Sequence, residues 1–87
     1  MKKKIAILGS TGSIGKSTID IIKKDKKNFD VMLLTTNNNY REILKQSREF
    51  KARNIIVNNK KSYLILKKKL KNYKINVFND FESFFNT

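Results

Sequence analysis

The glycine-rich stretch GSTGSIGKST, residues 9–18, has the residue types and the spacing that suit chemistry with phosphates. Small residues let backbone N–H groups approach an anion closely, and a helix that follows adds the positive end of its dipole. Two kinds of phosphate-binding loop match parts of this stretch. The triphosphate loop G-x-x-x-x-G-K-[ST] shares the ending Gly15-Lys16-Ser17, whereas the dinucleotide turn G-x-G-x-x-G shares the spacing of the glycines.

The spacing of the glycines decides between the two loops. Ser10 stands where the triphosphate loop requires its first glycine, because Gly9 comes one position too early. The dinucleotide turn keeps Gly12 and Gly15 as its last two glycines, and Gly9 opens the turn with one extra residue. We expect Gly9 to let the chain leave a strand sharply, Gly12 to admit a pyrophosphate, and Gly15 to pack a helix closely on that strand.

The elements that must position this loop can be predicted on either side of it. The apolar run Ile5–Leu8 ends at a glycine, which is typical of a strand buried on both faces. A helix is predicted from Ser13 onward. Its inner face is predicted to consist of four residues at helical spacing: Ile14, Thr18, Ile21 and Ile22.

The rest of the chain alternates strands and helices. The further predicted strands are Phe29–Thr35, Asn54–Asn58 and Ile75–Phe78. Two further helices are predicted. One begins after Asn39, and the other covers Ser62–Leu70 with Tyr63, Leu66 and Leu70 inward. This order indicates parallel strands joined by right-handed crossovers. The predicted fold class is therefore α/β, with a Rossmann-type parallel sheet and flanking helices.

Several polar residues near the loop have more than one possible role. Ser13 can cap the helix, contact a phosphate, or do both. Asn39 precedes Glu42 by three residues, as in a capping box, so it can be a cap as well as a ligand residue. Thr11 has no capping role in the predicted elements, which favours a ligand contact for it.

The composition limits the chemistry of the chain. The 87 residues include 20 Lys+Arg and 7 Asp+Glu, a net charge of +13, and an alternative function is therefore a basic nucleic-acid-binding module. The lysine runs lack the interleaved aromatics and arginines of a nucleic-acid groove, which favours solvent-facing helix surfaces instead. No cysteine or histidine is present, so we assign no catalytic and no metal-binding residue. No apolar run is long enough for a membrane span, and a cytoplasmic protein is expected.

The segment ILGSTGSIGKSTIDII closely resembles the N-terminal segment of 1-deoxy-D-xylulose 5-phosphate reductoisomerases, which act second in the non-mevalonate isoprenoid pathway. The resemblance extends from Lys3 to about Phe78. It includes Phe29, Val31, Leu34, Asn39, Gln46 and Phe50.

The resemblance implies an NADPH-dependent oxidoreductase and isomerase with a divalent metal, Mg or Mn. Such an enzyme rearranges deoxyxylulose 5-phosphate and reduces the intermediate to 2-C-methyl-D-erythritol 4-phosphate, and it is expected to be a homodimer. The residues that match the family's pyrophosphate contacts are Thr11, Gly12, Ser13 and Ile14, and those that match its adenosine-ribose loop are Asn37, Asn38 and Asn39.

The chain departs from the family in two respects. The family usually has Gly and then Lys or Ser where this chain has Asn37 and Asn38. Its members also run to several hundred residues, with the metal and substrate-phosphate ligands in a later domain. Residues 1–87 are therefore expected to be the N-terminal part of an NADPH-binding Rossmann domain. The domain that binds metal and substrate is absent, and this chain alone is expected to be inactive.

Overall fold

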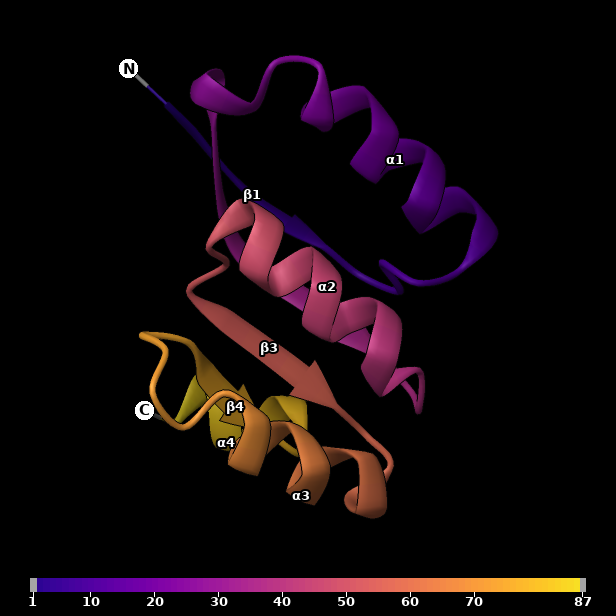
Figure 1. Cartoon of the computed structure of the whole chain (residues 1–87), viewed down its shortest axis with the longest axis vertical. Helices are drawn as coiled ribbons and strands as arrows, with labels where there is room; N and C mark the ends of the chain where they lie inside the picture. The colour runs from indigo at the N-terminus through magenta and orange to yellow at the C-terminus, as the bar shows by residue number, and fades with distance from the viewer. Residues whose placement is uncertain (1, 87) are drawn as a thin grey trace.

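The structure, a computed structural model, describes residues 2–86 as one alternating series of strands and helices (Figure 1). The elements are β1 (Lys3–Ile7), α1 (Ser13–Lys23), the 3-10 turn η1 (Lys26–Asn28), β2 (Phe29–Thr36), α2 (Tyr40–Phe50), β3 (Asn54–Val57), α3 (Lys60–Lys69), β4 (Asn76–Phe78) and α4 (Phe81–Phe85). The alternation predicted from the sequence is confirmed.

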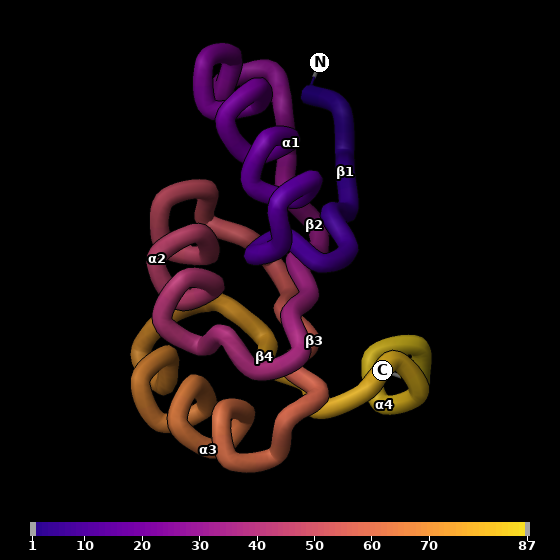
Figure 2. The backbone as a smooth tube through the Cα atoms, turned by 90° about the vertical axis from the view of Figure 1, so that its right-hand side faces the viewer, coloured from indigo at the N-terminus to yellow at the C-terminus, as the bar shows by residue number. Residues whose placement is uncertain are grey.

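The four strands form one parallel sheet in the order β1-β2-β3-β4, which confirms the α/β Rossmann-type class. Because each crossover advances in the same direction along the sheet, α1, α2 and α3 all lie on one face (Figure 2). The short helix α4 lies on the opposite face, beside β4.

The core lies between the sheet and the three helices. Leu34 of β2, Ile43 of α2, Ile55 of β3 and Leu66 of α3 are each 0% exposed. Leu66 and Leu70 point inward as predicted, and Tyr63 is half-buried against the same core. Burial of side chains of this size contributes about 1.5–3 kcal/mol each relative to exposure, so this layer holds the sheet and its helices together.

The boundaries of β1 differ from the prediction. The strand covers Lys3–Ile7 instead of Ile5–Leu8, and Leu8 is 63% exposed in the turn that follows. Gly9 has a φ of +66°, so the chain turns away from the sheet around these residues. An apolar residue at the end of a run therefore does not always belong to the strand.

The predicted inner face of α1 is wrong for two of its four residues. Ile14 is 84% exposed and Ile21 is 68% exposed, whereas Gly15, Ile19 and Ile22 are buried. Gly15 sets this orientation, because a Cβ atom there would lie 2.1 Å from the carbonyl oxygen of Gly9. The side of α1 with no room for a side chain must face the loop and the strand.

The C-terminal helix α4 was not predicted. It follows β4 directly and begins at Asp80, whose side chain accepts a hydrogen bond from the Ser83 N–H at 2.7 Å. Phe84 packs edge-on against Phe78 of β4, with ring centroids 5.5 Å apart.

Within residues 2–86, no helix has the length and hydrophobicity that a membrane span requires.

Candidate functional site

The candidate site lies where β1 and β2 end. The loop at residues 8–12 follows β1, and Asn37–Asn39 follow β2, so both segments come to the carboxyl edge of the sheet (Figure 1). In open parallel sheets this edge is where ligands bind. The hydroxyls of Thr11 and Thr36 are 2.7 Å apart and join the two segments. All seven predicted cofactor residues therefore lie in these two loops and the first turn of α1.

The three glycines of the loop differ in whether the fold requires a glycine at their position. Gly9 adopts a left-handed backbone, and its carbonyl accepts from the Gly12 N–H at 3.0 Å. Gly15 has no room for a Cβ atom. At Gly12, however, an added Cβ would lie 3.5 Å from the Gly9 oxygen, an ordinary contact. The fold itself does not require a glycine at position 12, which is consistent with a requirement imposed by a ligand.

The first turn of α1 offers open hydrogen-bond donors. Gly12 occupies the N-cap position, so the interpretation of Ser13 as the cap is wrong, and Ser13 is the first helical residue. The first bond of the helix runs from the Lys16 N–H to the Gly12 carbonyl at 2.8 Å. The N–H groups of Ser13 and Ile14 come before it and donate to no group between residues 2 and 86. Together with the helix dipole they suit an anion.

Residues of β2 and α2 fix the loop through hydrogen bonds. The Gly9 N–H donates to the Thr35 hydroxyl at 2.8 Å, and the Ser10 N–H donates to the Thr35 carbonyl at 2.9 Å. The Gln46 side chain donates through Nε2 to the Ser10 carbonyl at 3.0 Å. Sequence reasoning did not assign these roles to Thr35 and Gln46. The available signal was a glutamine on the inner face of a helix, beside Ile43 and Ser47.

The hydroxyl of Thr11 is partly committed within the protein. It shares a hydrogen bond with the Thr36 hydroxyl, and either oxygen can be the donor. Each hydroxyl carries one hydrogen, so the pair leaves one hydrogen unused. Thr11 is half-buried and retains a donor for a second acceptor through this pair. A ligand contact at Thr11 stays a prediction that this geometry permits.

The loop after β2 has a fixed backbone and exposed side chains. The Asn37 carbonyl accepts from the Asn59 N–H at 2.8 Å, and the Asn38 carbonyl accepts from the Ser62 hydroxyl at 3.0 Å. Asn39 Oδ1 accepts from the Glu42 N–H at 3.3 Å, which confirms its role as a helix cap. The side chains of Asn37 and Asn38 are exposed and have no hydrogen-bond partner in the described part of the chain.

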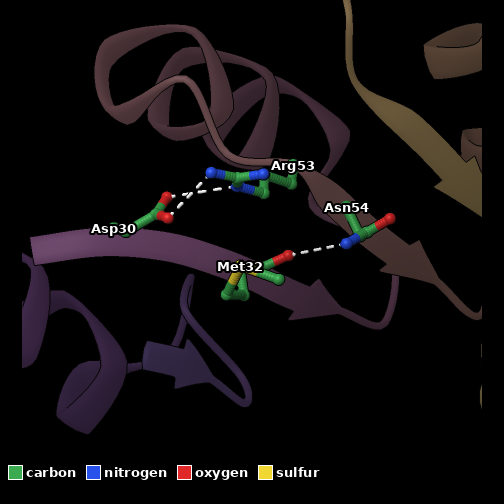
Figure 3. Close-up of polar contacts among 4 residues, drawn as sticks. All are labelled: Asp30, Met32, Arg53 and Asn54. Atoms are coloured by element: carbon green, nitrogen blue, oxygen red, sulfur yellow. Dashed lines mark hydrogen bonds and ion pairs between the residues drawn. The ribbon is translucent and has the colours of Figure 1, made fainter. Parts of the chain in front are cut away.

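The end of β2 carries no carboxylate. The acid of this strand, Asp30, lies at its beginning and accepts from Arg53 at 2.9 Å (Figure 3). The adjacent contact, from Asn54 Nδ2 to the Met32 carbonyl at 2.9 Å, fixes the same end of the β2–β3 pair. The strand ends in Thr35 and Thr36, so the position that accepts from a ribose hydroxyl in NAD-selective proteins has no acid.

Basic side chains border the site. Arg41 Nε donates to the Tyr40 hydroxyl at 3.3 Å. This hydrogen bond and the charge of Arg41 lower the pKa of Tyr40, and the same hydrogen bond and the charge of the Tyr40 phenolate raise the pKa of Arg41. Lys16 lies exposed in the first turns of α1.

Among the described residues, no three His, Cys, Asp or Glu side chains gather in a way that could hold a metal ion.

A parallel sheet, a glycine turn that opens a helix at its carboxyl edge, and a polar loop after the next strand are features that this chain shares with the dinucleotide-binding class of α/β proteins. The comparison with known families is more specific. The profile of the family "1-deoxy-D-xylulose 5-phosphate reductoisomerase" matches residues 5–86, and the chain belongs to this family.

Individual relatives agree with the family match. The chain is 56% identical over 81 residues to the 1-deoxy-D-xylulose 5-phosphate reductoisomerase of Pelagibacter ubique, covering 93% of this chain and 21% of that protein. It is 45% identical over 78 residues to the enzyme of Porphyromonas gingivalis, covering 90% of this chain and 20% of that one. The chain thus spans about a fifth of the length of these relatives.

Solved structures of 1-deoxy-D-xylulose 5-phosphate reductoisomerases share the fold. The reductoisomerase of Zymomonas mobilis in complex with NADPH superposes with a TM-score of 0.85 at 27% identity, over 90% of this chain and 21% of that one. A reductoisomerase in complex with NADPH, fosmidomycin and magnesium gives a TM-score of 0.84 at 28% identity, over 93% of this chain and 20% of that one.

Proposed function

We propose that residues 1–87 form the N-terminal part of the NADPH-binding domain of a 1-deoxy-D-xylulose 5-phosphate reductoisomerase. Such an enzyme converts deoxyxylulose 5-phosphate into 2-C-methyl-D-erythritol 4-phosphate with NADPH and a divalent metal. The open N–H groups at the start of α1, beside a glycine that the fold itself does not require, carry the proposal. The NADPH complexes of the similar solved structures support it.

Each residue of the site has a part in this proposal. The N–H groups of Ser13 and Ile14 bind the pyrophosphate, and Gly12 allows it to approach the backbone. The hydroxyl pair of Thr11 and Thr36 supplies a further donor. NADPH supplies the hydride for the reduction when it is bound. This segment provides its binding and orientation, while the metal and the substrate bind to residues outside it.

The loop after β2 binds the adenosine ribose in this proposal. The exposed side chains of Asn37 and Asn38 lie there, and Asn39 fixes the start of α2. Because no acid follows β2, the loop does not repel a 2′-phosphate. We therefore propose a preference for NADPH over NADH. We also propose a homodimeric, cytoplasmic enzyme, in keeping with the family to which the chain belongs.

Titration of NADPH into the isotope-labelled 87-residue chain tests the proposal by NMR. We expect the amide signals of residues 11–14 and 37–39 to move while those of α3 stay in place. ATP at the same concentration and at 0.15 M salt is the control for simple attraction to a chain of charge +13. Salt-dependent binding of a polyanion without any response to NADPH would instead favour the nucleic-acid-binding alternative.

A chimera tests the enzymatic part of the proposal. Residues 1–87 replace the matching segment of the Pelagibacter ubique enzyme, with which the chain shares 56% identity. We expect the chimera to oxidise NADPH in the presence of deoxyxylulose 5-phosphate and a divalent metal. We expect no such turnover from the 87-residue chain alone, since the described residues hold no metal-binding cluster.

A further inference from the structure

We propose that Gln46 is a positioning residue for the pyrophosphate-binding loop, and that its side-chain amide sets the direction of the Thr11 N–H. The inference rests on the proposed function and adds a residue that does not itself touch the cofactor. Gln46 lies on α2 and reaches the loop from a position 36 residues away in the sequence. Its Nε2 atom donates to the Ser10 carbonyl at 3.0 Å.

The burial of Gln46 shows that this contact is specific. Gln46 is 4% exposed and Ser10 is 0% exposed. Its second polar atom, Oε1, is buried and has no hydrogen-bond donor in the described part of the chain. A buried polar group without a hydrogen-bond partner destabilises the folded state. An apolar residue would suit this face of α2 better for stability alone, so the contact with Ser10 explains the glutamine.

The geometry of one peptide unit connects Gln46 to the ligand side of the loop. The Ser10–Thr11 peptide is trans, so its carbonyl and its N–H point in opposite directions. Gln46 holds the carbonyl toward α2, which directs the Thr11 N–H away from α2. That N–H donates to no group among residues 2–86, and no side chain other than Gln46 donates to the Ser10 carbonyl. A flipped peptide would direct the carbonyl oxygen outward, and its partial negative charge would repel an anion.

The same helix carries the other half of the site. The N-cap of α2 is Asn39, in the loop that we assign to the adenosine ribose. Gln46 therefore links the pyrophosphate loop to the helix that begins at the ribose loop. Together with the contacts of Thr35 and the Thr11–Thr36 hydroxyl pair, this side chain keeps the two halves in a fixed relation before a ligand binds, which is how preorganisation raises affinity.

The variant Gln46→Met tests the inference, with Ser47→Ala as the matched control. Methionine has a similar length but no donor, so the Ser10 carbonyl loses its partner. Ser47 is also 0% exposed, but its hydroxyl donates within α2, to the Leu44 carbonyl at 3.0 Å. Both variants remove a hydrogen bond made by a buried side chain of the same helix, and only the first removes one to the loop.

The ligands in the test are NADPH and adenosine 2′-monophosphate, which lacks the pyrophosphate. We expect Gln46→Met to weaken NADPH binding by the 87-residue chain about tenfold and to leave the binding of adenosine 2′-monophosphate unchanged. In the chimera, the KM for NADPH should rise while kcat changes little. Ser47→Ala should affect neither ligand. Equal NADPH affinity in Gln46→Met, or a parallel loss for both ligands that follows the melting temperature, would overturn the inference.

A ligand-free measurement separates this inference from the proposed function. In the unliganded chain, Gln46→Met should shift the Ser10 carbonyl-carbon and Thr11 amide-nitrogen signals and leave the signals of Ile55 in the core unchanged. If the wild-type chain does not bind NADPH, the proposed function fails, and these signals alone decide the role of Gln46. Unchanged signals at Ser10 and Thr11 would refute it.

Discussion

Two glycines in the same loop are required for different reasons, and substitutions can tell them apart. Gly15 faces the Gly9 carbonyl with no space for a methyl group, whereas Gly12 has ordinary space around it and lies exposed. Gly15 therefore matters for folding. We propose that Gly12 matters for the binding of a ligand instead.

We predict that Gly15→Ala lowers the free energy of unfolding by about 1–3 kcal/mol or more, because the loop must move to admit the methyl group. Gly12→Ala should leave the free energy of unfolding nearly unchanged and reduce the affinity for NADPH. Urea unfolding and calorimetric titration measure the two effects. The explanation fails if Gly15→Ala is as stable as the wild type, or if Gly12→Ala binds NADPH with undiminished affinity.

Asn38 is the residue at which we predict a gain of affinity. Its side chain is exposed without a partner in the described residues, and no acid lies at the end of β2. Asn38→Lys adds a charge-assisted contact to the 2′-phosphate, worth on the order of 1.5–3 kcal/mol, or about tenfold to a hundredfold in affinity. NADH has no such phosphate, and its affinity should not rise comparably. Titration of both cofactors into the chimera and its variant tests this, and tighter NADH binding in the unsubstituted chimera would contradict the proposed preference.

At the scale of elements, the glycine spacing and the alternation of apolar runs were enough to predict the parallel sheet and the loop at its edge. The orientation of α1 was not predictable from periodicity. Ile14 and Ile21 match an apolar stripe, yet Gly15 needs the inner side of the helix for close packing. Hydrophobic patterns report burial in general, whereas a close backbone contact is set by tertiary structure.

The supports of the loop were equally hard to predict. Thr35 and Gln46 act through hydrogen bonds to backbone groups that are 26 and 36 residues away in the sequence. No local pattern relates such partners. A buried glutamine becomes informative only when the carbonyl opposite it is known.

The helix α4 is predicted to respond to acid. The backbone N–H of Ser83 lowers the pKa of Asp80 below its ordinary value, because it stabilises the charged carboxylate. A lowered pKa means that the stabilisation of the helix is complete above the pKa of an unfolded aspartate, about 4, and is lost as the pH falls through the lowered pKa.

Carbon chemical shifts of residues 81–85, followed from pH 5 to pH 2, measure this effect. We expect the helical shifts to decrease at the acid end in the wild type. Asp80→Asn keeps an oxygen acceptor but cannot titrate, so its helical shifts should not follow the same curve. Identical curves for both proteins would show that another group controls α4.

At the scale of the whole molecule, the sheet is covered unevenly. Among the described residues, α1, α2 and α3 cover one face, and α4 is the one helix on the other (Figure 2). The aromatic rings of Phe81 and Phe85, both on α4, stack against each other, and Phe85 is 73% exposed. Exposed aromatic clusters of this kind promote association between protein molecules.

We predict that the isolated 87-residue chain self-associates despite its net charge of +13. Sedimentation should show a weight-average mass that rises with concentration. Phe85→Lys should shift the distribution toward the monomer, whereas the control Leu64→Lys, at an exposed position on α3, should have a smaller effect. A sharp monomer at all concentrations in the wild type would contradict this prediction.

The strand order β1-β2-β3-β4 also has a consequence for the synthesis of the protein. Within residues 2–86, each strand after β1 pairs with the strand made immediately before it, and none of the four inserts between two earlier ones. Each new β-α unit can therefore dock onto a finished edge as it leaves the ribosome, at a chain growth of about 5–20 residues per second. The glycine loop and its supports at Thr35 and Gln46 are complete once α2 has emerged. Within residues 2–86, the loop that we assign to the pyrophosphate can thus assemble before β3, α3 and β4 have been made.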